Sequence, residues 1–505
     1  MNIVFIYPYE QGFTLQTSEF NRLKEQAIVF NFAIAQLSAV LKQKNHITSL
    51  VPMTSEQQET PIGDPKIKAA DVIAFSFSEA ELDWCIRLSN ELKKAYPEKV
   101  QIGGGIGAIL NHELILKNAS MDFVCVGEGE YAFPEVLRRL AKNEDTRGIK
   151  NLHCKIDSKI FLSEIGEIVK DLDTLPLYDY DLFDDFPLKH LQSNLPRLYY
   201  LVGRNCQFNC TFCANHRKKK AMGVSKMSDY LRRFSPERVI QDIQTLQIRY
   251  PQAKVIHFND EIIHSDSVWF EKFALLYKER INLPWRSYAS LAILRERTVE
   301  LMALSNCYRV NVGIESGSER IRKDIYNRPG ISNAEIIRKI GMLKAAGIGV
   351  HASNLFGAPT ETIDDMFDTL LLNAEAGVDI PVSGIVVPYR NTKLYEISQA
   401  LGKLDETKYN NEGVSILTEP GVTKVQVQFL REYTVEIVKI LEYARTLSKE
   451  SKEKIVSFVY WLIKNPEMDF DLLIQLNSVF FREHSLDLVY ERMESKFGRE
   501  KSEFL

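Results

Sequence analysis

The sequence predicts an α/β protein with three successive parts: a doubly wound, Rossmann-like domain, a partial barrel of six β/α units and a helical C-terminal region. Short apolar runs alternate with amphipathic stretches over residues 1–142 and again over residues 196–400. This alternation is typical of a parallel sheet covered by helices. Long amphipathic stretches then fill residues 401–505. Residues 143–195 lack a clear pattern, so we expect them to link the two α/β domains.

The first domain is expected to end its strands in small residues. Its predicted strands are 2–7, 47–51, 71–76 and 122–126, and its predicted helices are 31–44, 79–96 and 130–142. The small and glycine-rich positions that follow strands are Ser76, Ser78, Gly103, Gly104, Gly105, Gly127, Glu128 and Gly129. Ligands of such sheets bind at the carboxyl ends of the strands, where glycines allow close approach to the backbone. These positions therefore predict a ligand site, although glycines there can also serve only as tight turns.

The second domain is predicted from six further strands. They are 198–202, 254–258, 285–288, 309–314, 348–356 and 383–387, with helices such as 236–250 and 333–346 between them. Active sites of βα barrels lie at the carboxyl ends of the strands. The C-terminal helices are expected at 425–447, 454–463 and 472–481. Their apolar stripes favour packing against the barrel over binding to a membrane.

Three cysteines follow the first predicted barrel strand. Cys206, Cys210 and Cys213 have the spacing C-x₃-C-x₂-C. Three thiolates can hold three irons of a four-iron cluster and leave the fourth iron open to a small molecule. A zinc site completed by His216 is the alternative, but structural zinc sites favour two matched pairs and the sequence has no second pair. The spacing therefore favours an iron–sulfur cluster over zinc.

Composition narrows the classes of partner. The chain has 63 Lys and Arg residues against 67 Asp and Glu residues, a formal charge of −4. Because nucleic-acid binding needs a surplus of cations, no nucleic-acid partner is expected. No stretch of about 18 apolar residues suggests membrane insertion. The N-terminus lacks signal-peptide features, and the seven cysteines do not form a disulfide framework, so the expected location is the cytoplasm.

With these motifs the chain resembles the radical S-adenosylmethionine (SAM) enzymes of the cobalamin-binding subgroup. The cysteine motif carries the aromatic Phe212 before its last cysteine, and the first domain has the glycine pair and the Val-Gly-Glu-Gly-Glu run of that subgroup. The resemblance implies three cofactors: a [4Fe-4S] cluster on the three cysteines, SAM and cobalamin. The implied SAM contacts are Phe212, Asn259, Asp260, Glu315, Ser316, Gly357 and Pro359. The implied cobalamin contacts are the eight strand-end positions of the first domain named above.

The resemblance also implies an activity. Asp260 is a candidate partner of the SAM amino group, and Glu315 a candidate hydrogen-bonding partner of SAM. We expect reductive cleavage of SAM to a 5′-deoxyadenosyl radical and methylation of an unactivated carbon of a small molecule or natural product. A flavodoxin or ferredoxin would be the reductant. Two alternatives remain: a radical rearrangement, cyclisation or oxidation without methyl transfer, and a zinc-bearing binding module. The sequence does not name the substrate.

Overall fold

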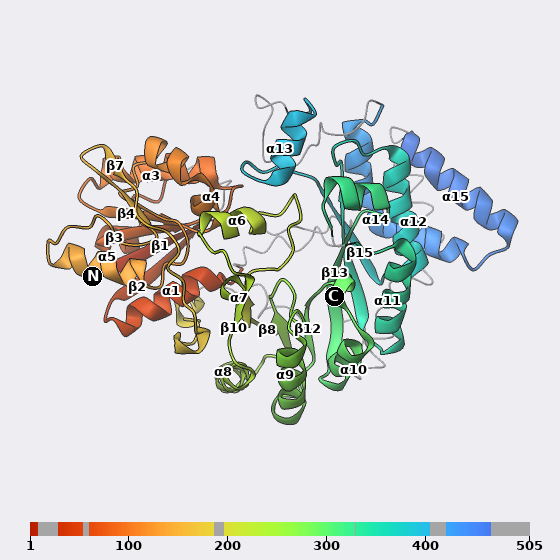
Figure 1. The fold of residues 1–505 in the computed structure, drawn as a ribbon, viewed down its shortest axis with the longest axis horizontal. Coiled ribbons are helices and arrows are strands. Elements are labelled where there is room, and N and C mark those ends of the chain that lie inside the picture. The colour runs from red at the N-terminus through yellow and green to blue at the C-terminus, as the bar shows by residue number, and fades with distance from the viewer. Residues whose placement is uncertain (9–28, 54–59, 186–195, 329, 405–420, 466–505) are drawn as a thin grey trace.

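A computed structural model describes residues 1–8, 29–53, 60–185, 196–328, 330–404 and 421–465. Figure 1 shows two α/β bodies, with further helices packed at the far side of the second one. The predicted helix 472–481 lies outside the described residues. The order of the parts confirms the predicted fold class.

The first domain is built on a seven-stranded sheet with the order β2-β1-β3-β4-β5-β6-β7. Its strands are β1 (Asn2–Pro8), β2 (Ile47–Met53), β3 (Val72–Ser76), β4 (Val100–Gly104), β5 (Phe123–Cys125), β6 (Leu152–Ile156) and β7 (Lys159–Phe161). The first five are parallel. The order 2-1-3-4-5 is that of a doubly wound sheet, whose ligands bind at the switch point between β1 and β3.

Helices cover both faces of this sheet. They are α1 (Phe32–Gln43), α2 (Pro65–Ala69), α3 (Leu82–Ala95), α4 (Ile106–Asn118) and α5 (Ala132–Ala141). Alternate residues of β1 enter two separate cores, with Ile3 and Phe5 on one face and Val4 and Ile6 on the other. Helix α4 is absent from the predicted elements, because the glycines at its start resemble a loop.

The predicted linker is partly wrong. Strand β6 pairs antiparallel with β5, and β7 pairs with β6, so the first sheet continues to Phe161. The boundary placed at residue 142 is therefore too early. Antiparallel edge strands need no crossover helix, so the strand-helix alternation that marks the rest of the domain is missing here.

The second domain is a six-stranded parallel sheet with the order β15-β14-β13-β12-β11-β8. Its strands are β8 (Arg197–Tyr200), β11 (Val255–Phe258), β12 (Trp285–Ala289), β13 (Cys307–Glu315), β14 (Gly349–Phe356) and β15 (Ile380–Ile385). Its helices are α8 (Pro236–Arg249), α9 (Ser267–Arg280), α10 (Glu296–Leu304), α11 (Asn333–Ala345), α12 (Ile363–Ala376) and α13 (Lys393–Ala400). The six predicted units are confirmed, with β15 beginning three residues before its predicted start.

Between β8 and β11 the chain forms a small excursion. It contains β9 (Gly203–Arg204), α6 (Asn215–Ala221), α7 (Met227–Tyr230) and β10 (Arg232–Arg233). Strands β9 and β10 pair antiparallel as a separate hairpin. In Figure 1 helix α6 lies between the first domain and the barrel.

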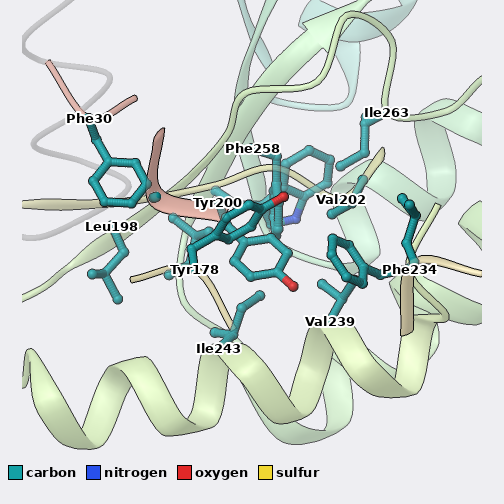
Figure 2. Packing of buried hydrophobic residues seen from close by; sticks show 14 of the residues in the cluster. Phe30, Tyr178, Leu198, Tyr200, Val202, Phe234, Val239, Ile243, Phe258 and Ile263 are labelled. Carbon is teal, nitrogen blue, oxygen red and sulfur yellow. The ribbon is translucent and has the colours of Figure 1, made fainter. Parts of the chain in front are cut away.

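One hydrophobic core runs through both domains. Figure 2 shows Tyr178, from the connection between the domains, beside Tyr200 of β8 and above helix α8. The two ring centroids are 5.7 Å apart. Phe30, from the first domain, stacks on the neighbouring Tyr180 at 4.5 Å. The acidic, aromatic connection is therefore part of the core and fixes the two domains relative to one another.

The C-terminal helices α14 (Lys424–Ala444) and α15 (Lys449–Lys464) pack on the far side of the barrel. Leu430 and Ile437 of α14 share a buried cluster with Met366 and Leu370 of α12. This confirms the packing predicted from their apolar stripes. Within the described ranges, none of the helices combines the length and apolar character needed to cross a membrane.

Candidate active site

The cysteine loop lies at the carboxyl end of β8, just beyond the short strand β9. All three cysteines are free thiols: Cys210 is buried, Cys206 half-buried and Cys213 exposed. Among the described residues, no three His, Cys, Asp or Glu side chains gather closely enough to hold a single metal ion. A four-iron cluster makes a different demand, because each cysteine binds a different iron and the sulfurs need not converge on one point. The donor set of three thiolates fits such a cluster.

One end of the loop is fixed by Asn215. Its Nδ2 donates hydrogen bonds to the carbonyl oxygens of Cys206, at 2.7 Å, and Phe208, at 3.1 Å. The Tyr230 hydroxyl donates to Asn215 Oδ1 at 2.7 Å and so orients the amide. Before the first cysteine, Asn205 has a φ of 71°, a left-handed conformation that asparagine tolerates better than most residues. These contacts fix the backbone around Cys206.

The other end of the loop is joined to the fourth and sixth units of the barrel. The Thr211 N–H donates to the Tyr326 carbonyl oxygen at 3.0 Å, and the Thr211 hydroxyl donates to the Ile325 carbonyl oxygen at 2.6 Å. The N–H of Leu394 in α13 donates to the Thr211 carbonyl at 2.9 Å. Phe212, a predicted SAM contact, rests edge-on against the Tyr326 ring at 5.2 Å. The loop is therefore held from both sides of the barrel mouth.

Arg328 connects Cys210 with the end of β13, and no sequence motif singled it out. Its Nη1 lies 3.5 Å from Cys210 Sγ, and its Nη2 donates to the Gly313 carbonyl at 2.7 Å. Nη1 is also 3.9 Å from Glu315 Oε1. Glu315 is buried with a φ of 68°, a strained conformation for a non-glycine residue and one that gathers at functional sites. Burial raises the pKa of Glu315, and the charge of Arg328 opposes that rise.

Asp260 serves the backbone just before the cysteine loop. Its Oδ2 accepts the Val202 N–H at 2.9 Å, in the turn between β8 and β9. Burial raises the pKa of Asp260 to about 7. Its predicted contact with the SAM amino group therefore stays a prediction. The neighbouring Asn259 is exposed and donates its N–H to the Tyr200 carbonyl at 2.8 Å.

Glu261 is a residue that the predicted site omits. Burial raises the pKa of the Cys206 thiol to about 11, and the charge of the exposed Glu261 adds to that rise. Glu261 therefore lies near the cysteine loop, three residues beyond the end of β11. The signal was present in the sequence, because Glu261 directly follows Asp260 in the same short run.

Gly357, after β14, has a φ of 86°. Its N–H and that of Ala358 donate to Glu361 Oε2 at 2.7 and 2.9 Å, which closes the turn that contains Pro359. Glu361 is fully buried, and burial raises its pKa to about 8. Ser316, the last of the predicted SAM contacts, is buried with its Oγ 3.4 Å from Thr369 Oγ1 of α12.

The predicted cobalamin positions divide into two kinds. Ser76 and Gly104 end neighbouring strands, and both are half-buried. A side chain at Gly104 would make only ordinary contacts. By contrast, Gly105 has a φ of 89°, and a side chain there would lie 2.7 Å from the Phe77 carbonyl oxygen. A side chain at Gly103 would meet the flexible side chain of Met121, which can move. Internal packing therefore requires a glycine at Gly105, whereas Ser76 and Gly104 lie at the carboxyl ends of their strands.

Three more predicted positions have internal neighbours. Ser78 donates its N–H to Glu81 Oε2 at 2.7 Å, at the start of α3. Gly127, with a φ of 128°, lies against the Asn151 side chain, and Gly129 against Leu37. These residues shape the loops at the strand ends.

Glu128 joins the first domain to the cysteine loop. Its carboxylate accepts hydrogen bonds from Arg232 at 2.6 and 2.9 Å and from the Val169 N–H at 2.7 Å, and Arg204 lies 2.9 Å away. Arg204 also pairs with Glu130 at 2.5 Å. We call Glu128, Glu130, Arg204 and Arg232 the interdomain clamp. Burial alone would raise the pKa of Glu128, but the two guanidinium groups outweigh it and lower the pKa to about 2. Glu128 thus contacts the barrel domain, a role that the sequence did not predict.

Comparison with known proteins identifies both domains. Residues 200–372 match the Radical SAM superfamily, and residues 23–137 match the B12 binding domain. The chain thus contains a radical SAM domain preceded by a B12 binding domain, in the order that the resemblance implied.

Two curated relatives align with parts of the chain. Uncharacterized methyltransferase PH0819 of Pyrococcus horikoshii is 25% identical over 299 residues, which cover 59% of this chain and 62% of the relative. Cytidylyl-2-hydroxyethylphosphonate methyltransferase of Streptomyces wedmorensis is 26% identical over 319 residues, which cover 56% of this chain and 57% of the relative. The matched part therefore spans about three-fifths of the length of these relatives.

A solved structure extends the likeness over nearly the whole chain. The cobalamin-dependent S-adenosylmethionine radical enzyme OxsB, with aqua-cobalamin and S-adenosylmethionine bound, superposes with a TM-score of 0.64 at 14% identity. The superposition covers 96% of this chain and 75% of OxsB. At this identity the likeness concerns the fold alone.

Proposed function

We propose that the chain is a cobalamin-dependent radical SAM enzyme that methylates an unactivated carbon of a small molecule. The observation that carries this proposal is the interdomain clamp. Glu128 follows β5 at the ligand-binding edge of the first domain, and Arg204 lies two residues before Cys206. The clamp therefore brings the candidate cobalamin edge and the cysteine loop together, as methyl transfer between the two domains requires.

The residues at the barrel mouth fit the proposed cofactors. Cys206, Cys210 and Cys213 would hold the [4Fe-4S] cluster, and Ser76 and Gly104 lie at the edge that would receive cobalamin. When bound, these groups supply the electron that cleaves SAM to a 5′-deoxyadenosyl radical and the methyl group that the substrate carbon accepts. The chain's own part is to orient and to balance charge: Arg328 donates toward Cys210, and a charged donor stabilises a thiolate.

The finer parts of the proposal rest on chemistry and on relatives. Two curated relatives are named as methyltransferases, which supports methyl transfer over other radical reactions. The reductant would be a flavodoxin or ferredoxin, and the substrate a small molecule rather than a nucleic acid. An oxygen-sensitive cluster and unpaired cysteines suit the cytoplasm.

Removal of a cluster ligand tests the proposal. Anaerobically reconstituted protein, given SAM and dithionite, should release 5′-deoxyadenosine, and Cys206→Ala should lose this activity by at least a hundredfold. Cys154→Ala, in β6, is the matched control and should retain it. Retained deoxyadenosine production in Cys206→Ala would overturn the cluster assignment.

A second candidate is radical chemistry without methyl transfer. It is favoured by Gly105, whose lack of a side chain is explained by internal packing without any ligand. The products distinguish the two: methylation yields S-adenosylhomocysteine together with 5′-deoxyadenosine, whereas the alternative yields 5′-deoxyadenosine alone. The zinc-bearing module predicts neither product and a colourless protein that contains zinc.

A further inference from the structure

The two faces of the barrel sheet differ in character. Val310 and Val312 of β13 enter the hydrophobic core beneath the helices, as do Trp285 of β12 and Leu198 of β8. Because side chains alternate along a strand, their neighbours project from the opposite face. We call this the inner face. In Figure 1 helices α8 to α11 lie along the outer side of the sheet, away from the first domain.

Three arginines occupy the inner face, and we call them the arginine cluster: Arg197, Arg286 and Arg309. Arg286 and Arg309 are direct Cα partners on β12 and β13. His257 of β11 is the Cα partner of both Arg286 and Tyr199. Arg197 precedes Tyr199 by two residues and therefore lies on the same face of β8. Arg286 and Arg309 therefore lie in one row across the sheet, level with His257 and Tyr199. Arg197 lies in the neighbouring row.

Within the described chain these guanidinium groups have no anionic partner. The Nε atom of each arginine is buried without a hydrogen bond. Arg286 is only 9% exposed. The carboxylate that acts on Arg309 belongs to Asp379, which already pairs with Lys344 at 3.0 Å and accepts the Val350 N–H at 2.8 Å. Burial, together with the charges of the other two arginines, lowers the pKa of Arg309 to about 10.

The next row of the inner face, toward the cysteine loop, is also polar. Asn311 Oδ1 and His351 Nε2 are buried without hydrogen bonds in the described residues, and their Cα atoms are partners on β13 and β14. Tyr288 lies in the same row and is 37% exposed. Folded proteins normally satisfy buried polar atoms, and an unpaired buried charge destabilises the fold. So many unpaired polar atoms on one face indicate a polar ligand.

We infer that the arginine cluster binds the anionic group of the substrate, a phosphate, phosphonate or carboxylate, inside the barrel. This inference rests on the proposed function, because it assumes that the substrate enters the barrel beside the cysteine loop. Arg309 precedes Glu315 by six residues on β13, a Cα separation of roughly 20 Å at 3.3 Å per residue. The long arginine side chains shorten this gap, so the substrate would be elongated, with its anionic end remote from the reacting carbon.

Thermal unfolding of the ligand-free protein tests whether the arginines are unpaired. Arg309→Met and Arg286→Met each replace a buried charge by an apolar chain of similar length, so each should raise the Tm by about 2–4 °C. A fall in Tm would mean that a carboxylate of the chain already pairs with the cluster, and would overturn the inference. Arg297→Met, an exposed arginine of α10 that pairs with Glu271, is the control and should change the Tm little.

Anion binding is the second test, with inorganic pyrophosphate as the phosphate probe and succinate as the carboxylate probe. Calorimetry should detect one of the two binding to the wild type and to Arg297→Met. Arg309→Met should weaken that binding at least tenfold, and Arg309→Lys should lose less because it keeps the charge. Binding of pyrophosphate alone would assign a phosphate or phosphonate, and binding of succinate alone a carboxylate. Absence of binding, or equal binding to wild type and Arg309→Met, would overturn the inference.

The wild-type protein separates this inference from the proposed function. Release of 5′-deoxyadenosine from SAM reports on the cysteine loop, whereas pyrophosphate or succinate binding reports on the arginine cluster. A protein that binds the anion but never cleaves SAM would contradict the proposed function alone. A protein that cleaves SAM but binds neither anion would contradict only the arginine cluster as an anion site.

Discussion

Buried carboxylates with backbone partners shape the strand ends around the candidate site. Asp260 accepts the Val202 N–H before the cysteine loop, and Glu361 accepts two N–H groups in the turn after β14. Hydrogen bonds between side-chain oxygens and backbone N–H groups fix loops that carry no regular structure. These two acids therefore act on the backbone of the barrel mouth.

Glu361→Gln should make stability less dependent on pH. Glu361 has a pKa of about 8 in the folded protein against an ordinary value of 4.5, so the folded state retains a proton that the unfolded chain releases. Wild-type stability should therefore fall as pH rises from about 4.5 to about 8, by roughly 1.4 kcal/mol per unit of pKa difference at most. The glutamine variant keeps an oxygen acceptor and lacks this titration. Urea unfolding at pH 5 and pH 8 measures the effect, and an identical fall in both proteins would contradict it.

Single residues also show what the sequence could and could not predict. The spacing of the three cysteines alone indicates a metal-binding loop, and that role stays a prediction. Arg328 was not predictable, because it reaches Cys210 across 118 residues and has no motif of its own. Asp260 and Glu361 attracted attention as acids, but only the fold reveals that backbone N–H groups occupy their oxygens. Long-range partners are set by packing, which one sequence does not display.

At the scale of elements, the β9–β10 hairpin connects the first domain to the cysteine loop. Arg204 and Arg232 are antiparallel partners in this hairpin, and both meet Glu128. The side chains of the clamp are mostly buried, with Arg232 5% and Glu128 10% exposed. Removing one partner of a buried pair leaves an uncompensated charge, which is more costly than the pair is stabilising.

Glu128→Gln should destabilise the protein and uncouple its two domains. We expect a loss of roughly 3–5 kcal/mol, as for other broken buried pairs, and a lower yield of methylated product for each 5′-deoxyadenosine formed. The carboxylate of Glu128 stabilises the fold above its ordinary pKa, and this contribution is lost as pH falls toward about 2. Urea unfolding and the product ratio are the measurements. Glu135→Gln, on the surface of α5, is the control and should cost less than about 1 kcal/mol. An unchanged product ratio in Glu128→Gln would refute the positioning role.

The contact between the end of β13 and helix α12 predicts a second effect at this scale. A side chain at Gly317 would overlap the Asp368 carbonyl oxygen, so Gly317→Ala should force the two elements apart and cost about 1–3 kcal/mol. Gly341 of α11 has no atom within 4 Å of an added side chain. Gly341→Ala should therefore stabilise the protein by roughly 0.5–1 kcal/mol, because alanine favours the helix. Unfolding in urea compares the two, and equal effects would argue against the crowding at Gly317.

Across the whole molecule, the periodic parts were predictable and the connections were not. Strand-helix alternation predicted both α/β domains because each domain repeats one simple packing pattern. The connection between the domains lacks this pattern. Strands β6 and β7 extend the first sheet, and Tyr178 and Tyr180 enter a core shared with the barrel. That shared core explains how two domains, recognisable separately in the sequence, form one body.

The metal and cofactor content of the whole protein tests the account most directly. Chain purified without oxygen and incubated with iron, sulfide and cobalamin should contain about four iron atoms and four sulfide ions, as a [4Fe-4S] cluster requires, together with about one cobalt. Cys206→Ala should lose the iron and sulfide but keep the cobalt, because the two groups bind different domains. A wild-type protein that contains zinc in place of iron and sulfide would contradict the account.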